Sequence, residues 1–312
     1  MNMVLEVSNL SVLFHGSELT HAVHEVSFGI EKGEVLALVG ETGCGKSVIA
    51  HAIMSLLPSE AEVRGEIMFR SRDLLRLSEK ELSAIRGREL AIVFQNPSLA
   101  LNPVHTIGRQ VAEPFAVHRI MGRKEASGRA ARALERMGFS SSEDYMGMYP
   151  SQCSGGMNQR FVIAASTILN PPLVIADEPT KGLDSSLVDG VCNELQRLVH
   201  ENNTSLLLIT HDLAVARRLS DRIAVMYSGE IIEMADTEAF FENPLHPYSR
   251  GLLMSLPENG FVPIPGTSPS PVSPPPGCRF QPRCTEGNRE CAERHPDLLF
   301  TRDHYVRCFF CH

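Results

Sequence analysis

The chain has 312 residues, of which 43% are hydrophobic and 21% are charged, and its 29 Lys and Arg against 37 Asp and Glu give a formal net charge of −8. A chain of this length and composition can bury a sizeable core in one large or two smaller domains. The acidic balance argues against nucleic acid as a partner, because nucleic-acid affinity depends on Lys and Arg that neutralise phosphates. The apolar runs are far shorter than the roughly 20 residues that span a bilayer, and the first residues lack the basic and apolar segments of an export signal. We therefore expect a cytoplasmic protein, at most one that lies on a membrane surface.

The start of the chain predicts β-strands. Residues 4–7 and 11–14 mix β-branched and apolar residues, which is typical of strands, and residues 22–30 repeat this character after a polar turn. Residues 34–39 instead form a continuous apolar run, the pattern of a strand that is buried on both faces of a parallel sheet.

A glycine-rich segment with the spacing of a P-loop follows this run directly. It consists of Gly40, Glu41, Thr42, Gly43, Cys44, Gly45, Lys46 and Ser47, and Val48 then begins an apolar helix. The glycines let backbone N–H groups close around phosphates, and the helix N-terminus adds partial positive charge. In this motif the lysine, here Lys46, contacts the β- and γ-phosphates, and the serine, Ser47, ligates Mg²⁺.

Residues 97–165 are mostly helical in pattern and are predicted to form an inserted helical subdomain. At the end of this segment Ser154, Gly155 and Gly156 begin an apolar helix that contains Gln159, which makes a second anion-binding helix start. A single chain that binds one nucleotide does not need two separate phosphate-binding helix starts. Two chains that face each other head to tail can each complete the site of the other, so we expect a pair of ATPase subunits.

Two further buried runs, 173–176 and 205–209, flank a helical pattern formed by Val188, Val191, Leu195 and Leu198, and this alternation predicts an α/β core. Asp177 and Glu178 follow the first of these runs, and α/β sheets bind their ligands at the carboxyl ends of parallel strands. We expect Asp177 to hold Mg²⁺ through water and Glu178 to orient and polarise the attacking water.

Taken together, these segments resemble the ATP-binding subunits of ABC transporters over residues 1 to about 240. The resemblance implies an α/β fold: a P-loop NTPase core of the ABC type with an N-terminal antiparallel β-subdomain and a helical subdomain inserted at about 97–165. It also implies ATP and Mg²⁺ as cofactors. The P-loop residues through Val48, together with Ser154, Gly155, Gly156, Gln159, Asp177 and Asp184, are then expected to contact the nucleotide.

The remaining motifs of the family occur in the expected order. Gln95 matches the Q-loop, which senses the γ-phosphate and contacts the membrane subunit, and it is expected to share Mg²⁺ with Ser47 and Asp177. Asp184 belongs to a D-loop, and His211 matches the switch histidine that contacts the γ-phosphate. Phe14 is placed to stack on adenine, with a core phenylalanine as the alternative. Cys153, where Leu is usual, and Lys181, where a small residue is common, depart from the family pattern.

Other segments resemble the oligopeptide/dipeptide branch of importers, which includes nickel and opine importers. They are residues 96–103 after the Q-loop, His246-Pro247-Tyr248, and the segment 275–284, which reads Pro-Pro-Gly-Cys-Arg-Phe-Gln-Pro-Arg-Cys. The resemblance implies an ATPase that powers peptide import, with nickel-chelate or opine import as alternatives in the same branch. A soluble ABC ATPase that does not serve transport is the alternative from another class, but this chain lacks the coiled-coil insertion or second cassette that such proteins carry.

The implied partners are two membrane-spanning permease subunits, a second ABC ATPase subunit and an extracytoplasmic solute-binding protein. A heterodimer of ATPase subunits is expected, with a homodimer as the alternative. The chain would then lie peripherally on the cytoplasmic face of the inner membrane.

The end of the chain is rich in proline and then in cysteine. We expect a proline-rich connector at 241–277 and a small irregular metal-binding extension at 278–312. Five of the eight cysteines lie in that extension, and a reducing compartment favours metal binding over disulfides. The spacing fits two zinc-binding pairs poorly, and by family resemblance we expect a 4Fe–4S cluster on Cys278, Cys284, Cys291 and Cys308, with Cys311 as a spare. Zinc and unligated cysteines are the alternatives. Because the groups needed for hydrolysis lie before residue 212, the extension is expected to serve a structural or docking role.

Overall fold

The computed structural model describes residues 3–311, which fall into two compact units that we describe separately. The first unit contains Ile30–Val35 and Arg76–Ile209 together with residues 3–4. The second contains Leu5–Gly29, Leu36–Leu75 and the chain from Thr210 onward. No helix within residues 3–311 is both long and apolar enough to cross a membrane.

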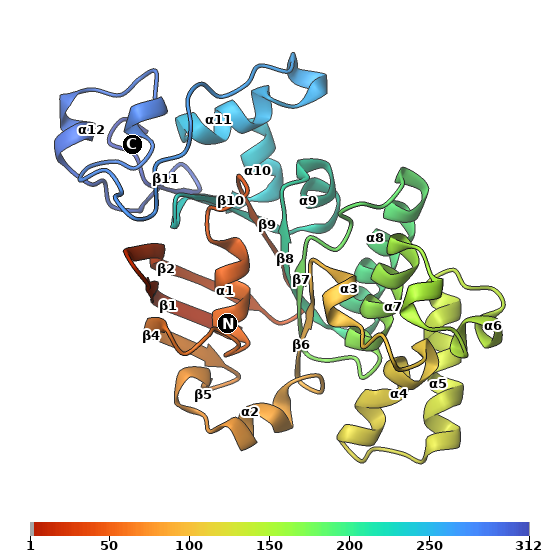
Figure 1. Ribbon diagram of the computed structural model, residues 1–312. Helices are drawn as coiled ribbons and strands as arrows, with labels where there is room; N and C mark the ends of the chain where they lie inside the picture. Colours follow the sequence, from red (N-terminus) through yellow and green to blue (C-terminus); the bar gives the residue numbers. More distant parts are fainter. Residues whose placement is uncertain (1–2, 312) are drawn as a thin grey trace. The chain divides into compact units, whose positions relative to one another are not determined.

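An antiparallel sheet near the N-terminus belongs to the second unit (Figure 1). Its order is β2-β1-β4-β5, and its strands are β1 (Met3–His15), β2 (Leu19–Glu31), β4 (Ala61–Phe69) and β5 (Arg72–Asp73). The antiparallel pairing of β1 with β4 places Leu5 opposite Phe69. The prediction of strands in this region is confirmed.

The two strands predicted at 4–7 and 11–14 are one strand that is interrupted by an irregularity. The register of β1 against β4 shifts between Ser8 and Ser11, and Asn9 adopts a φ of 50°. Gly65 approaches from β4 with a φ of 104°, and a Cβ on it would lie 2.6 Å from the Asn9 carbonyl oxygen. The residues between the two predicted segments therefore form a bulge, in which one strand bends without ending.

The second unit also contains a mixed sheet with the order β11-β12-β10-β9-β3. Its strands are β3 (Val35–Val39), β9 (Arg222–Tyr227), β10 (Glu230–Asp236), β11 (Leu299–Thr301) and β12 (His304–Val306). β3 pairs with β9 in parallel, whereas the pairs β9–β10, β10–β12 and β11–β12 are antiparallel. The helices of this unit are α1 (Lys46–Ile53), α9 (Leu213–Leu219), α10 (Thr237–Glu242), α11 (Pro247–Met254) and α12 (Arg289–Glu293).

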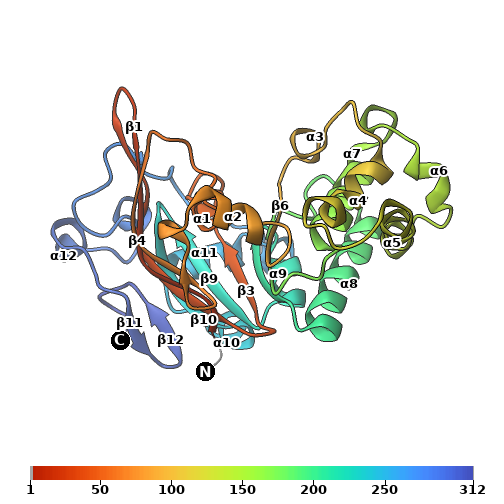
Figure 2. The ribbon, with the colours of Figure 1, turned by 90° about the horizontal axis from the view of Figure 1, so that it is seen from below.

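Two expectations for the end of the chain are wrong in part. The segment 241–277 is not extended throughout, because the eight-residue helix α11 lies in its first half and the prolines crowd only after this helix. The extension is not wholly irregular either, because β11 and β12 continue the sheet beyond β10 (Figure 2). An unpaired edge of β10 would leave backbone groups without hydrogen bonds, and β12 satisfies them.

The first unit combines a parallel sheet with helices. Its strands, in the order β8-β7-β6, are β6 (Leu90–Val93), β7 (Leu173–Asp177) and β8 (Ser205–Thr210), and their residues are buried, as the continuous apolar runs predict. Its helices are α2 (Glu79–Ile85), α3 (Pro97–Ala100), α4 (Ile107–Val117), α5 (Arg123–Arg136), α6 (Ser142–Met146), α7 (Gly155–Thr167) and α8 (Ser185–Asn202). Within the helical group, drawn yellow to green in Figure 2, Phe139 stacks on Phe161 of α7 with ring centroids 4.6 Å apart. The predicted helix over 188–198 is confirmed as part of α8.

Candidate nucleotide-binding site

The predicted P-loop connects β3 to α1, and close packing around its backbone requires glycine at two positions. A Cβ on Gly40 would lie 2.1 Å from the Met226 carbonyl oxygen, and a Cβ on Gly45 would lie 2.5 Å from the Ala22 carbonyl oxygen. Both glycines have positive φ angles, 149° and 107°. By contrast, Gly43 is exposed, and no atom lies within 4 Å of the place of its missing Cβ. The backbone of the loop is therefore closely packed at Gly40 and Gly45 and open at Gly43. A loop that binds phosphate through its N–H groups needs such an open side.

Lys46, the first residue of α1, is buried inside this loop. Its Nζ donates hydrogen bonds to the carbonyl oxygens of Gly40, at 2.7 Å, and Glu41, at 2.9 Å. The ammonium group thus lies against the concave backbone whose N–H groups would bind phosphate, next to Ser47 and the N-terminus of α1. Burial raises the pKa of the neighbouring Cys44 thiol, which keeps it neutral, so Cys44 acts here as a packing residue.

Two buried carboxylates end β7 in the first unit. Asp177 and Glu178 are both buried, and the Glu178 backbone N–H donates to the Ile209 carbonyl oxygen at 2.8 Å. Glu178 has a φ of 51°, a strained conformation that proteins retain mostly at functional positions. Val93 of β6 pairs with Ala176 of β7, so the exposed Gln95 and these carboxylates follow neighbouring strands at one sheet edge.

The helix start at residues 154–156, which we call the signature segment, and the D-loop segment pack together in the first unit. Ser154 caps α7 by accepting a hydrogen bond from the Met157 N–H at 3.3 Å, as the predicted helix start requires. A Cβ on Gly156 would lie 3.1 Å from a methyl carbon of Leu183, whereas nothing lies within 4 Å of a Cβ on Gly155. Ser154, Gly155 and the D-loop residue Asp184 are exposed. These segments can therefore face another molecule.

Three other predicted residues occupy different surroundings. Gln159 is only 2% exposed within α7, and its Nε2 has no hydrogen-bond partner among residues 3–311. The structure thus places Gln159 in the interior, away from the exposed signature residues. His211 is exposed directly after β8, and the next residue, Asp212, caps α9 by accepting from two backbone N–H groups. Phe14 is half-buried near the end of β1, opposite Ala61.

Four of the five cysteines of the extension line one small enclosed cavity. They are Cys278, Cys284, Cys291 and Cys308, and phenylalanine side chains form part of the same wall. Burial, with a smaller contribution from the nearby Cys291 and Cys308, raises the pKa of Cys278 to about 11. Cys311 does not line the cavity, and its thiol donates to the Leu245 carbonyl oxygen at 3.1 Å. Within residues 3–311, no group of three or more His, Cys, Asp or Glu side chains is placed to hold a metal ion.

The P-loop also contacts residues to which the sequence analysis gave no role. The Glu41 N–H donates to the Tyr248 hydroxyl at 3.0 Å, and the Arg283 guanidinium lies 2.9 Å from the Glu41 carboxylate. Both residues stand in segments that marked the importer branch, which was the only available signal for them. Tyr248 belongs to α11 and Arg283 to the C-terminal extension.

The fold and these motifs define a P-loop ATPase of the ABC type. A family model described as ABC transporter matches residues 23–181, and one described as oligopeptide/dipeptide transporter, C-terminal region, matches residues 232–291. The chain belongs to the ABC transporter ATPase family, in the group that carries this C-terminal region.

Curated relatives match almost the whole chain. The oligopeptide transport ATP-binding protein AppD of Bacillus subtilis is 43% identical over 99% of this chain and 97% of its own length. The dipeptide transport ATP-binding protein DppD of the same organism is 42% identical over 99% of this chain and 95% of its own length. Among solved structures, the ATP-binding cassette MJ0796, including a dimer bound to ADP and phosphate, matches 75% of this chain and 98% of its own length at 29% identity and a TM-score of 0.68.

Proposed function

We propose that this chain hydrolyses ATP to power an importer of dipeptides or oligopeptides. The observation that carries this proposal is the intact set of nucleotide motifs joined to the C-terminal region that peptide-transport relatives share. Import of a nickel chelate or an opine would use the same ATPase chemistry. The experiment below therefore distinguishes peptide import from these two alternatives.

In the proposed reaction, each residue acts from the position described above. The P-loop amides and Lys46 would bind the phosphates of ATP. Ser47 of the second unit, and Gln95 and Asp177 of the first, would each offer an oxygen ligand to Mg²⁺, and the ion would supply charge neutralisation at the phosphoryl group. Glu178 polarises the attacking water, and His211 contacts the γ-phosphate. Ser154 and Gly155, exposed at the start of α7, serve the nucleotide of the facing subunit.

Pairing of two such subunits couples ATP to transport. ATP favours the closed pair because it contacts both subunits only in that state, and hydrolysis removes this preference. The second subunit is a related ATPase in a heterodimer, or a second copy of this chain.

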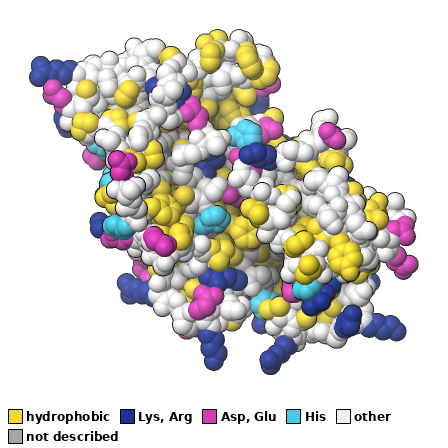
Figure 3. All heavy atoms as spheres, in the orientation of Figure 1, with side chains coloured by type: hydrophobic (Ala, Val, Ile, Leu, Met, Phe, Trp, Pro, Cys, Tyr) yellow, Lys and Arg dark blue, Asp and Glu magenta, His cyan; other side chains and the backbone are white. Residues whose placement is uncertain are grey.

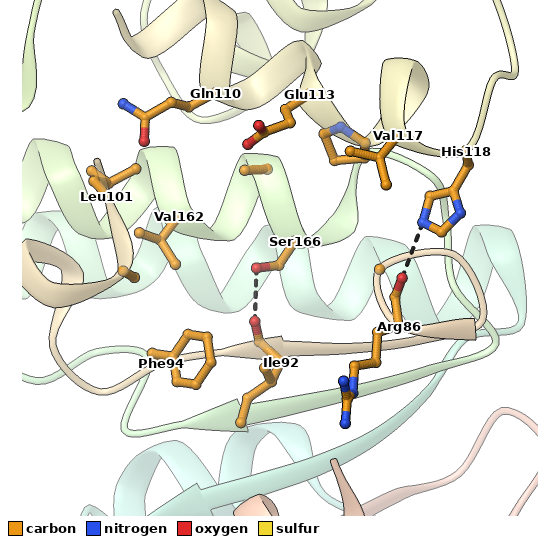
Figure 4. A pocket seen from close by; sticks show the side chains of 14 residues that line it. Arg86, Ile92, Phe94, Leu101, Gln110, Glu113, Val117, His118, Val162 and Ser166 are labelled. Carbon is orange, nitrogen blue, oxygen red and sulfur yellow. Dashed lines mark hydrogen bonds between the residues drawn. The ribbon is translucent and has the colours of Figure 1, made fainter. Parts of the chain in front are cut away.

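A pocket of about 290 Å³ in the first unit is the proposed docking site for a permease subunit (Figure 4). Glu113, Val117 and His118 of the α4 region face Ser166 of α7 and Ile92 of β6 across it. Ser166 donates to the Ile92 carbonyl oxygen at 2.8 Å, which holds the floor of the pocket together.

Apolar side chains around this pocket are unusually exposed. Val117 in its lining is 61% exposed, Leu99 next to the lining residue Ala100 is 85% exposed, and hydrophobic side chains lie on the surface over α3 and α4 in Figure 3. Exposed apolar groups beside a pocket mark an interaction site. Because Phe94 lines the pocket and Gln95 follows it, we assign the site to a cytoplasmic segment of the permease. The chain would then lie on the cytoplasmic face of the inner membrane, with the solute-binding protein on the other side.

For the extension we propose a 4Fe–4S cluster on Cys278, Cys284, Cys291 and Cys308. Such a cluster needs four cysteine ligands, and these four line one cavity, although as they stand within residues 3–311 they are not grouped closely enough to hold a metal ion. Protein purified without oxygen should be brown and carry about four iron atoms per chain. Cys278→Ser should lose the iron, whereas the matched control Cys311→Ser should keep it, since Cys311 lies outside the cavity. One bound zinc, or metal-free folded protein, would contradict the cluster.

The transport function is tested with the chain reconstituted in liposomes with its permease and binding protein. Binding protein loaded with a dipeptide or oligopeptide should stimulate ATP hydrolysis, and the empty binding protein should not. Stimulation only by a nickel chelate or an opine would replace the peptide assignment. Full hydrolysis without any membrane partner would favour a soluble ABC ATPase.

A further inference from the structure

The turn between the first two cysteines of the extension contacts the P-loop directly. Arg283, adjacent to Cys284, lies 2.9 Å from the Glu41 carboxylate, and Ser268 donates to the same carboxylate oxygen at 2.6 Å. Tyr248 of α11 accepts a hydrogen bond from the backbone of Glu41 at 3.0 Å. One P-loop residue therefore has three partners that all lie beyond residue 240.

The position of Arg283 is fixed by further contacts. Its Nε donates to the Pro265 carbonyl oxygen at 2.8 Å, and its guanidinium lies 5.7 Å from the centre of the Tyr227 ring. Phe280, in the same turn, packs edge-on against Tyr227 and Tyr248 with centroids 5.2 and 5.5 Å apart. An arginine held this firmly presents a preorganised positive charge to Glu41.

A second residue of this turn reaches the P-loop by another route. Arg279 donates to the Ser228 carbonyl oxygen and pairs with Glu230 at 2.8 Å. The neighbouring Gly229 N–H donates to the Cys44 carbonyl oxygen at 2.9 Å. The turn thus supports both the start and the middle of the P-loop.

The negative charge of Glu41, which Arg283 contacts, affects nucleotide binding. Burial raises the pKa of Glu41, but hydrogen bonds from Arg283 and Ser268 and the charges of Arg283 and Lys46 outweigh it, so the pKa is lowered and the group stays ionised. A carboxylate in a phosphate-binding loop repels phosphate and competes for Lys46. Arg283 compensates this charge from outside the loop.

We propose that Arg283 is a positioning residue for ATP: it neutralises Glu41 and holds the P-loop, so that nucleotide affinity depends on the folded C-terminal extension. The sequence predicts a structural or docking role for the extension, apart from the nucleotide chemistry. The contact between Arg283 and Glu41 connects the extension to the nucleotide site. The proposal holds for whichever solute the transporter carries.

The test is ATP affinity, measured by titration calorimetry on the full chain. Arg283→Met should weaken ATP binding about tenfold, which corresponds to about 1.4 kcal/mol. Arg250→Met is the matched control, since Arg250 of α11 is 43% exposed and pairs with Glu286 of the extension instead of Glu41. This control should bind ATP like the wild type.

A double variant separates charge compensation from simple packing. Glu41→Gln combined with Arg283→Met should bind ATP within about twofold of Glu41→Gln alone, because no uncompensated charge remains. Arg283→Lys keeps the charge and should bind ATP more tightly than Arg283→Gln, which supplies the comparison if the methionine variant does not fold. Wild-type affinity in Arg283→Met, or no difference between the lysine and glutamine variants, would overturn the proposal. If the double variant bound ATP as weakly as Arg283→Met, Arg283 would act by packing and not by charge compensation, which would contradict the proposal.

Discussion

Glu233 is the residue whose removal should most clearly detach the C-terminal extension from the ATPase sheet. It lies in β10 and is fully buried, and its Oε1 accepts from the Leu245 N–H at 2.8 Å and pairs with His304 Nδ1 at 2.7 Å. Its Oε2 accepts from the His246 N–H at 2.9 Å. One carboxylate thus connects β10, the start of α11 and β12.

Glu233→Gln keeps the shape and removes the charge together with one acceptor oxygen. In either orientation of the glutamine amide, at least one buried N–H loses its acceptor, which costs about 1–3 kcal/mol of stability. The remaining hydrogen bonds become weaker because their acceptor is no longer charged. We expect a total of about 3 kcal/mol, from one lost acceptor and the weakening of the remaining hydrogen bonds to the former carboxylate. Exchange of the amides of β12 should then accelerate ~150-fold, at 1.36 kcal/mol for each factor of ten.

Hydrogen exchange followed by mass spectrometry measures this local opening. The peptide that contains His304–Val306 should exchange faster in Glu233→Gln, whereas a peptide from β7 should not change. Glu238→Gln, an exposed glutamate at the start of α10, is the matched control and should leave β12 protected. Unchanged exchange at β12 in Glu233→Gln would refute the reasoning.

The same carboxylate predicts the effect of pH. Burial raises the pKa of Glu233, but hydrogen bonds from His304 and backbone N–H groups outweigh it and lower the pKa below its ordinary value of 4.5. A lowered carboxyl pKa gives stability that is present above pH 4.5 and is lost as the pH falls through the folded value. Protection of β12 should therefore be constant near neutral pH and fall on acidification, and Glu233→Gln should abolish that dependence.

The other predictions concern the nucleotide site. Glu178→Gln should abolish turnover while ATP binding survives, because this carboxylate polarises water and does not hold the nucleotide; near-wild-type hydrolysis would contradict its role. Lys46→Ala should weaken ATP binding by removing a charge from the phosphates, and equal affinity in titrations would exclude that contact. Gly40→Ala should also lose ATP binding, since its Cβ would collide with the Met226 carbonyl oxygen at 2.1 Å; a variant that binds ATP normally would show that the loop adapts. The isolated chain should hydrolyse ATP poorly, because Ser154 is proposed to serve the nucleotide of the facing subunit, and full activity in a preparation shown to be monomeric by light scattering would contradict this.

Local sequence patterns predicted the strands, the main helices and the P-loop correctly, because each depends on neighbouring residues. Gly40 and Lys46 are recognisable from their spacing, and the apolar run before Asp177 forms β7 as expected. The local pattern did not show that the segments 4–7 and 11–14 are one strand, since the bulge around Asn9 depends on pairing with β4.

Contacts between distant segments could not be predicted. Arg283 and Glu41 are 242 residues apart, and Glu233 and His304 are 71 residues apart. Neither pair leaves a periodic signal, because each pairing follows from how the extension packs on β9 and β10. A proline-rich and cysteine-rich sequence indicated a separate appendage, whereas its buried arginines and histidine satisfy carboxylates of the ATPase core.

Peptide import powered by this chain is tested most directly by uptake of a labelled peptide into liposomes that contain the assembled transporter. Wild-type protein should accumulate the peptide only with ATP and loaded binding protein, and Glu178→Gln should accumulate none although it binds ATP. Accumulation by the Glu178→Gln transporter, or ATP hydrolysis by the wild type without uptake of any di- or oligopeptide, would contradict the assignment.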